Sequence, residues 1–308
     1  MKNKILVFGS NGLVGSSISE KLLRNQKNYD VISSTREDTD LFNLKKTVKT
    51  IEDIKPNTII NAAAKVGGIY ANDTKRTEFI IENLKINMNI LEACIPFPEI
   101  KIINLGSSCI YPLNAKNPIS EESFMGGKLE NTNSPYAMAK LSAIEIGRAL
   151  SKQYGHKVIN LMPTNLYGPN DNFSKSESHV IPGMISRMHE AMINEEKNFE
   201  IWGTGKPKRE FLYVEDLSDA IKFIIENNIE DDLINIGSGE EINIYELANL
   251  VKKTLQYDVE FIFDDSKPDG NPRKFLDSSL INSYGWKAKT NLESGLQYTY
   301  KWFLDNVV

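Results

Sequence analysis

The chain has 308 residues, of which 41% are hydrophobic and 25% are charged, and its formal net charge is −5 at pH 7. This composition is that of an ordinary globular protein, and the negative charge argues against nucleic acid or an anionic membrane surface as the main partner. No apolar run approaches the roughly 20 residues that a membrane-spanning helix needs, and the run after Lys4 breaks at Gly9, unlike a signal peptide. With only two cysteines, Cys94 and Cys109, and three scattered histidines, we expect a cytoplasmic protein without a disulfide framework or a metal site.

The first half of the chain alternates short apolar runs with amphipathic segments. The expected strands cover 4–9, 29–35, 58–64, 101–107 and 158–165. The expected helices cover 14–25, 44–54, 79–95 and 134–155. Such alternation predicts an α/β fold with a doubly wound parallel Rossmann sheet. Ligands of these sheets bind at the carboxyl ends of the strands, so we expect Gly9, Ala64, Ser107 and Pro163 to line one cleft.

The segment "GSNGLVG" at 9–15 places glycines directly after the first strand and at the start of the first helix. A tight turn with a bare backbone lets a pyrophosphate reach the amino terminus of the helix, although a packing turn would also use these glycines. After the second strand, an acidic residue would bind the ribose 2′-hydroxyl of NAD, whereas an arginine would hold the 2′-phosphate of NADP. Arg36 stands there and favours NADP, but Glu37 and Asp38 beside it leave open a solvated surface arginine.

The second half is less regular, with helices expected near 179–193, 215–227 and 243–255. We interpret it as a smaller α/β substrate-binding lobe. The predicted division is an NADP-binding Rossmann domain at 1–164, with returning segments near 212–236, and a mainly substrate-binding lobe at 165–308.

The segment "SPYAMAK" places Tyr136 and Lys140 one turn apart on the same face of a helix. A phenol has a pKa near 10, and a neighbouring ammonium group is expected to favour the phenolate and ease proton exchange. Ser107, at the end of the preceding strand, can hydrogen-bond the same reacting oxygen. Serine, tyrosine and lysine around a carbonyl beside a nicotinamide would form a hydride-transfer site.

These glycines, Ser107 and the Tyr136–Lys140 pair resemble those of the extended short-chain dehydrogenases/reductases. Further segments resemble the GDP-L-fucose synthase family within that group: "NAAAKVGGIYAN", "LGSSCIYP", "PTNLYGPNDNF", "SHVIPGMI", "WGTGKPKREFLYVEDL" and "KPDGNPRK". The resemblance runs from residue 5 to about residue 302. It implies NADPH-dependent conversion of GDP-4-keto-6-deoxy-D-mannose to GDP-L-fucose, by epimerisation at C3 and C5 followed by reduction at C4.

The resemblance also implies residue roles. Cys109 would be the epimerisation base and His179 the acid, while Ser107 and Tyr136 would hold the enolate oxygen and Lys140 would assist Tyr136. The implied cofactor-binding residues are Gly9, Ser10, Asn11, Gly12, Leu13, Val14, Gly15, Arg36, Asp40, Leu41, Ala62, Ala63, Leu105, Gly106, Ser107, Ser108, Lys140, Pro163, Thr164, Asn165, Leu166 and His179. The implied substrate-binding residues are Arg187, Trp202, Arg209 and Asp269, with Arg273 and Lys274 as further candidates for a phosphate contact. Relatives form homodimers by packing two long helices, here expected at 79–95 and 134–154.

Several alternatives stay open at this stage. Cys109 could be a small buried hydrophobe, as Cys94 is expected to be, and Trp202 could be a core aromatic residue of the lobe. We expect His156 and His189 at the surface. The sugar could be a related GDP-4-keto-heptose. A non-catalytic dinucleotide sensor would share the fold, but the joint presence of serine, tyrosine and lysine argues against it.

Overall fold

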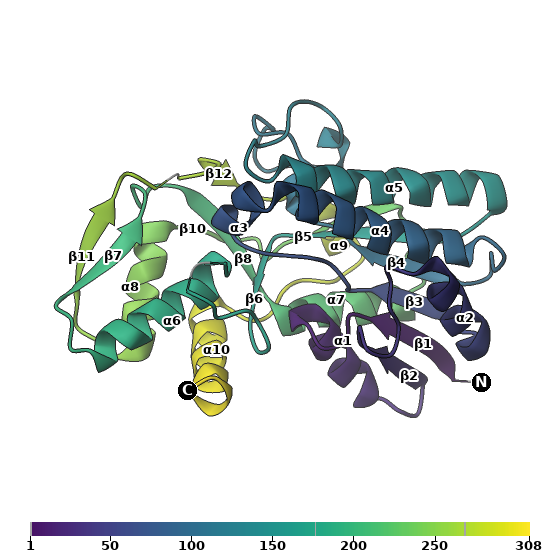
Figure 1. Cartoon of the computed structure of the whole chain (residues 1–308), viewed down its shortest axis with the longest axis horizontal. Coiled ribbons are helices and arrows are strands. Elements are labelled where there is room, and N and C mark those ends of the chain that lie inside the picture. Colours follow the sequence, from purple (N-terminus) through teal and green to yellow (C-terminus); the bar gives the residue numbers. More distant parts are fainter. Residues whose placement is uncertain (1, 176, 268) are drawn as a thin grey trace.

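The computed structural model describes residues 2–175, 177–267 and 269–308. At its centre lies a parallel sheet in the order β2-β1-β3-β4-β5-β9 (Figure 1). The strands are β1 (Asn3–Phe8), β2 (Tyr29–Ser34), β3 (Thr58–Asn61), β4 (Lys101–Leu105), β5 (Val158–Pro163) and β9 (Leu233–Ile236). This is the expected doubly wound Rossmann arrangement. Its strand order changes direction between β1 and β3, and ligands bind at such a switch point.

Helices cover both faces of the sheet because successive side chains of each strand point to opposite faces. On β1, Ile5 and Val7 pack in one core cluster with α1 (Leu13–Leu23) and α7 (Val214–Glu226). Leu6 and Phe8 pack in another. That second cluster includes residues of α2 (Leu44–Ile54), α4 (Arg76–Cys94) and α5 (Ser134–Tyr154). The near-continuous apolar strand is therefore buried on both sides, as its sequence indicates.

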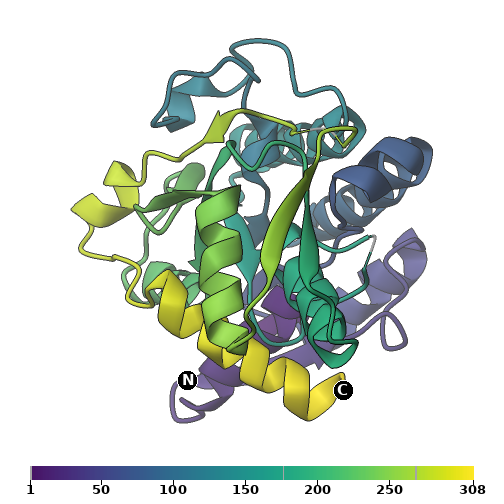
Figure 2. The ribbon, with the colours of Figure 1, turned by 90° about the vertical axis from the view of Figure 1, so that its left-hand side faces the viewer.

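A smaller lobe is built around a second sheet. Strand β8 (Lys208–Tyr213) pairs with β6 (Asn165–Tyr167), β10 (Glu241–Asn243) and β12 (Arg273–Lys274). Beside it, β7 (Asn198–Trp202) and β11 (Glu260–Asp264) form a two-stranded ribbon. The helices α6 (Val180–Ile193), α8 (Ile244–Leu255) and α10 (Leu292–Asn306) enclose a separate core with these strands (Figures 1 and 2).

The chain returns to the first sheet after building part of this lobe. Helix α7 packs against α1, and β9 pairs with β5 at the edge of the sheet. The remaining short elements are α3 (Ile69–Thr74), α9 (Ser279–Ser283) and two turns of 3₁₀ helix, η1 (Ser108–Ile110) and η2 (Glu121–Ser123). Within the described residues, no helix is long and apolar enough to cross a membrane.

Two local expectations were wrong, and one short helix was not predicted. The sequence did not indicate α3, whose six residues are too few to show a helical period. His156 and His189 are not at the surface, since only 3% and 8% of their areas are exposed. His189 is on α6 and faces α10, where its Nδ1 is 2.9 Å from the Tyr300 hydroxyl. Cys94 is fully buried, as expected.

Candidate active site

A cavity of about 620 Å³ lies where the carboxyl ends of the central strands face the smaller lobe. It brings most of the sequence-predicted site residues together. Those that line it are Gly12, Leu13, Val14, Ala62, Leu105, Gly106, Ser107, Ser108, Cys109, Tyr136, Lys140, Pro163, Thr164, Asn165, Leu166, His179, Arg187, Trp202, Arg209 and Asp269. Of the four strand-end residues expected in one cleft, Ala64, Ser107 and Pro163 line this cavity and Gly9 does not.

The predicted cofactor residues that do not line the cavity are Gly9, Ser10, Asn11, Gly15, Arg36, Asp40, Leu41 and Ala63. Two of these glycines are required by close backbone contacts in the β1–α1 turn. Gly9 has a φ of +77°, and a Cβ there would lie 2.7 Å from the Ala63 backbone. A Cβ on Gly15 would lie 2.1 Å from the carbonyl oxygen of Gly9. These two glycines therefore allow the close backbone packing of the turn but do not face the cavity.

The exposed side of this turn fits a dinucleotide. Gly12 is the N-cap of α1 and adds no side chain, and the nearest atom to a Cβ there would be 3.6 Å away. Helix α1, all of whose residues are described, carries no acidic side chain in its first turn. A pyrophosphate can therefore approach the free N–H groups of the helix terminus. Arg36 lies just beyond β2, exposed, with its guanidinium 5.0 Å from the centre of the Phe42 ring.

Ser107 and Cys109 lie on a single turn that follows β4. Ser107 is the N-cap of η1, and its hydroxyl oxygen accepts a hydrogen bond of 3.2 Å from the backbone N–H of Cys109. Both residues are partly buried in the cavity wall. The turn therefore presents a hydroxyl and a thiol to the same small volume.

Tyr136 enters the cavity from the first turn of α5, which contains Pro135. The ring of Phe79 packs edge-on against it, with centroids 6.2 Å apart. Burial raises the pKa of Tyr136, and the nearby Cys109 acts in the same direction, while a hydrogen bond with Ser107 acts in the opposite one. The expectation that Lys140 would favour the phenolate is therefore not met, and Tyr136 is a protonated phenol at neutral pH.

Lys140 lies one turn further along α5, with only 2% of its area exposed. Its ammonium group donates a 2.7 Å hydrogen bond to the Leu105 carbonyl, at the end of β4. Burial lowers the pKa of Lys140 from 10.5 to about 8. This bond ties the start of α5 to the strand that leads into the Ser107–Cys109 turn.

His179 is the N-cap of α6 and lines the cavity from the smaller lobe. The loop before α3 holds its segment in place, since Gly68 donates a 2.8 Å hydrogen bond to the Glu177 carbonyl. Lys75 forms an ion pair with the Glu177 carboxylate. Burial lowers the pKa of His179, and its contact with the Gly67 backbone acts in the opposite direction.

The far end of the cavity carries two arginines and a tryptophan. The Arg187 guanidinium lies 4.6 Å from the centre of the Trp202 ring and donates a hydrogen bond to the Glu200 carbonyl. Burial lowers the pKa of Arg187 and that of Arg209. Such partly desolvated guanidinium groups are suited to phosphate oxygens. Trp202 is 38% exposed, so it is not a core aromatic residue of the lobe.

Asp269 lies on the cavity wall with its carboxylate bound to the neighbouring turn. One oxygen accepts from the Thr204 N–H and the other from the Thr204 hydroxyl, each at 2.8 Å. Its carbonyl accepts a 3.1 Å hydrogen bond from Arg209. In this structure Asp269 therefore holds the turn after Trp202 and orients Arg209.

Sequence reasoning missed several residues of the cavity wall, among them Glu130, Asn133 and Asp171. Asn133 stands just before "SPYAMAK", so its place in the chain could have signalled it. Lys274 lines the cavity, but Arg273 turns away and pairs with Glu241. Pro268, within "KPDGNPRK", lies outside the described residues. Among the residues that are described, no cluster of His, Cys, Asp and Glu side chains could hold a metal ion.

Comparison with known proteins identifies the family of the chain. The model of the NAD dependent epimerase/dehydratase family matches residues 5–237. A GDP-L-fucose synthase from Sinorhizobium fredii is 46% identical over 304 residues, which cover 99% of this chain and 96% of that protein. GDP-L-fucose synthase 1 from Arabidopsis thaliana is 44% identical over 304 residues, which cover 99% and 94% of the two chains.

A solved structure extends the comparison to the fold. A GDP-D-glycero-L-gluco-heptose synthase from Campylobacter jejuni, solved in the presence of NADPH, matches with a TM-score of 0.90 and 30% identity over 98% of each chain. The chain therefore belongs to the NAD dependent epimerase/dehydratase family and, within it, to the GDP-L-fucose synthase family.

Proposed function

We propose that the protein converts GDP-4-keto-6-deoxy-D-mannose to GDP-L-fucose by 3,5-epimerisation and NADPH-dependent reduction at C4. One observation carries the proposal. The Ser107–Cys109 turn, Tyr136 and His179 line one cavity, so a thiol and an imidazole accompany the serine–tyrosine pair of a ketone reductase. An enzyme that only reduced a ketone would need neither the thiol nor the imidazole.

The first turn of α1 would hold the pyrophosphate of the cofactor, and Arg36 would hold the 2′-phosphate that distinguishes NADP from NAD. When bound, NADPH supplies the hydride for C4. Lys140 lies on the wall between the cofactor turn and Tyr136, in position to reach a ribose hydroxyl as well as the Leu105 carbonyl.

Epimerisation follows from the acidity of protons next to a ketone. Cys109, as a thiolate, takes a proton from C3 or C5, and the C–H electron pair moves into an enolate whose oxygen lies at C4. Ser107 and Tyr136 are the hydroxyl donors that face this oxygen, as in other oxyanion sites. His179, in its protonated form, then delivers a proton to the opposite face of the same carbon, and the pair of residues recovers its starting state by exchange with solvent.

Reduction uses the same two hydroxyl groups. Because burial raises the pKa of Tyr136, its phenol holds a proton at neutral pH and can deliver it to O4 as hydride arrives at C4. The carbonyl oxygen therefore stays in one place through both reactions, while the carbons around it meet Cys109 and His179.

The GDP portion would occupy the far end of the cavity. Arg187 and Arg209 supply positive charge for the diphosphate, and the flat face of Trp202 suits a guanine or a sugar ring. Glu200 accepts the Trp202 indole N–H at 3.1 Å and fixes the orientation of the ring.

Turnover in deuterated water tests the proposal. With GDP-4-keto-6-deoxymannose and NADPH, we expect NADPH oxidation and deuterium at both C3 and C5 of the product. A Cys109→Ser variant should lose the label while still reducing a ketone that has already been epimerised. Absence of NADPH oxidation by the wild type would refute the proposal, and reduction without label would remove Cys109 and His179 from the mechanism.

A second candidate substrate is a GDP-4-keto-heptose, because the matching structure from C. jejuni is a GDP-heptose synthase. The chemistry at C3, C4 and C5 would be unchanged, and only the substituent at C6 would differ. Comparing kcat/KM for the two ketones at equal NADPH decides between them. A higher value for the heptose would replace the deoxyhexose in the proposal.

We further propose that the protein is a cytoplasmic homodimer. Ile81 and Met88 lie seven residues apart, hence on one face of α4, and Met138 lies on α5; all three are more than 40% exposed. Helices α4 and α5 pack side by side (Figure 1), so their outer faces can form one apolar surface. Two free cysteines, one of them with a proposed catalytic role, fit a reducing compartment.

A further inference from the structure

Two side chains point their donor groups at the sulfur of Cys109: that of Asn133, which the sequence did not indicate, and that of Lys274, which it suggested only for a phosphate contact. The Lys274 ammonium lies 3.4 Å from Sγ, and the Asn133 side-chain amide donates to Sγ at 3.5 Å. They come from different parts of the fold, since Asn133 precedes α5 whereas Lys274 is on β12, in the smaller lobe. A cation and an amide donor converging on one sulfur are the surroundings that favour a thiolate over a thiol.

The fold fixes each of these donors independently. Strand β12 pairs in parallel with β8 so that Lys274 lies beside Arg209, and alternation along the strand sends the side chain of Arg273 away to Glu241. Lys274 is partly buried, so its side chain can adopt fewer conformations than that of the exposed Arg273.

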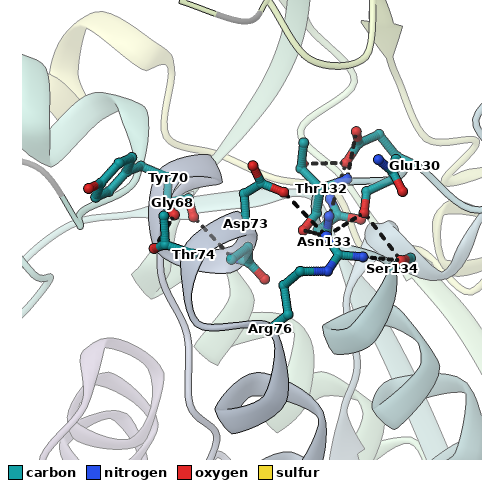
Figure 3. A network of polar contacts seen from close by, with 11 residues as sticks. Gly68, Tyr70, Asp73, Thr74, Arg76, Glu130, Thr132, Asn133 and Ser134 are labelled. Carbon is teal, nitrogen blue, oxygen red and sulfur yellow. Dashed lines mark hydrogen bonds and ion pairs between the residues drawn. The ribbon is translucent and has the colours of Figure 1, made fainter.

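Asn133 is held by the network in Figure 3. The Glu130 carboxylate accepts hydrogen bonds from the backbone N–H groups of Thr132 and Asn133 and from the Thr132 hydroxyl. Arg76, at the start of α4, donates to the carbonyls of residues 131 and 132 and to the Ser134 hydroxyl. The loop between residues 130 and 134 is therefore anchored at both ends, which fixes the backbone from which the Asn133 amide reaches the sulfur.

Further charged or titratable groups face the same place. Arg209 and Tyr136 lie near Cys109, whose proximity acts to raise the pKa of each. Burial acts to raise the pKa of Glu130, but its hydrogen bonds and the Lys274 charge lower it overall. Glu130 is thus an anion whose lone pairs are bound to its own loop, which leaves the ammonium of Lys274 directed at the sulfur.

We propose that Lys274 and Asn133 are positioning residues that direct their donor groups at the Cys109 sulfur, stabilise its thiolate form and aim it into the cavity. The part of this proposal that calls Cys109 the epimerisation base rests on the proposed function. The thiolate itself does not, because it is a property of the protein alone. The proton that leaves the thiol passes to solvent, and the thiolate later accepts the proton of the sugar carbon.

Alkylation of the free protein by iodoacetamide tests this directly, since only a thiolate attacks the reagent. Cys94 is a silent internal reference because it is fully buried and burial raises its pKa to about 12. Lys274→Met should slow alkylation at pH 7 by about tenfold or more and move the midpoint of the rate–pH profile upward. Lys274→Arg should restore most of the rate, because it restores the charge.

Asn133→Asp supplies a second variant that is expected to fold, because aspartate has nearly the same size and shape as asparagine. Its carboxylate should also slow alkylation. Lys267→Met is the matched control, since Lys267 lines the same cavity but lies over Trp202. Unchanged alkylation in Lys274→Met, or an equal loss in Lys267→Met, would overturn the proposal.

Turnover separates this proposal from the proposed function. Lys274→Met should incorporate less deuterium at C3 and C5 while reducing an already epimerised ketone at a rate closer to that of the wild type. Equal loss of both activities would mean that Lys274 acts on substrate binding and not on the thiol, which overturns its positioning role. If the wild type oxidises no NADPH, the proposed function is refuted. The effect of Lys274 and Asn133 on the Cys109 thiol is then still decided by the alkylation rates.

Discussion

Lys140 lowers the stability of the folded protein because its ammonium charge is buried. Below pH 8 it is charged in both the folded and the unfolded chain, and the difference between 10.5 and about 8 corresponds to a cost of roughly 3 kcal/mol. Between these values the unfolded chain still binds the proton that the folded chain has lost. Stability therefore rises with pH across this window, and above 10.5 the cost is gone.

Replacing Lys140 by methionine should therefore stabilise the protein at pH 7 while abolishing reduction. The gain will be smaller than the full cost, because the Leu105 carbonyl loses its 2.7 Å donor. Urea unfolding of both proteins at pH 7 and at pH 10 measures the effect. The advantage of the variant should shrink at the higher pH, and an equal difference at both would contradict the assigned cause.

Arg36 is expected to set the cofactor preference. Arg36→Ala should raise KM for NADPH by about tenfold, because a charge-assisted contact with the 2′-phosphate is lost, and should leave KM for NADH nearly unchanged. Glu37→Gln is the control, since Glu37 is the exposed neighbour. Equal changes for both cofactors would place Arg36 outside the phosphate site.

Gly68 is expected to control the position of His179. A Cβ on Gly68 would lie 2.3 Å from the Ser178 carbonyl oxygen, so Gly68→Ala must displace the segment that carries the imidazole. We expect deuterium incorporation at C3 and C5 to fall at least about tenfold, because catalytic geometry tolerates little displacement, while reduction falls less. Gly127→Ala, whose nearest neighbour would be a proline side chain at 3.2 Å, is the control. A parallel loss of both activities would argue against this role.

At the scale of elements, a line of asparagines crosses the centre of the parallel sheet. Asn61 on β3 donates to Asn104 on β4 at 2.9 Å, and Asn104 donates to Asn160 on β5 at 3.1 Å. The ends of the line are bound to Asn87 on α4 and to the Asp232 carbonyl. All three strand residues are directly paired in the sheet register. Because a one-residue slip would leave these buried amides unpaired, the line specifies the register.

Asn104→Leu tests this account. The change leaves donors and acceptors on both neighbouring strands unsatisfied, so we expect a loss of about 2–4 kcal/mol in the free energy of unfolding. Asn249→Ala, on the exposed face of α8, should change it by less than about 0.5 kcal/mol. Urea unfolding measures both. A loss at Asn104 no larger than at Asn249 would show that the line adds nothing to stability.

The periodic elements were predictable because each contains its own signal. Strand β1 and helix α2 lie within a residue of their expected bounds, and α5 ends where Gly155 takes a φ of +80°. The sequence did not predict the three-residue strands β6 and β10 or the helix α3, since segments this short show no hydrophobic periodicity. The division of the chain into two domains at residue 164 stays a prediction. The pairing of β9 with β5 supports the part of it in which a segment near 212–236 returns to the first domain.

At the scale of the whole molecule, the outer face of α4 and α5 is expected to hold two copies together. Met88→Glu should convert the dimer to a monomer, because a charge would be buried in an apolar interface. Light scattering coupled to size exclusion measures the mass against 34.8 kDa for one chain. Met125→Glu, at a 65% exposed methionine in the loop after η2, should not change it. A wild type that elutes as a monomer would refute the interface.

The amino-acid sequence alone predicted the strands β1–β5, the glycine turn after β1 and the candidate serine, tyrosine and lysine of the site, since periodicity and motifs are local. The candidate roles of the cysteine and the histidine came from the resemblance to a known family. The sequence could not show that the Tyr136 phenol keeps its proton, because a pKa depends on burial by distant segments. Only the tertiary structure decided what surrounds Cys109. Asn133 and Lys274 are 24 and 165 residues from it in the chain, and the pairing of β12 with β8 brings the lysine to the sulfur.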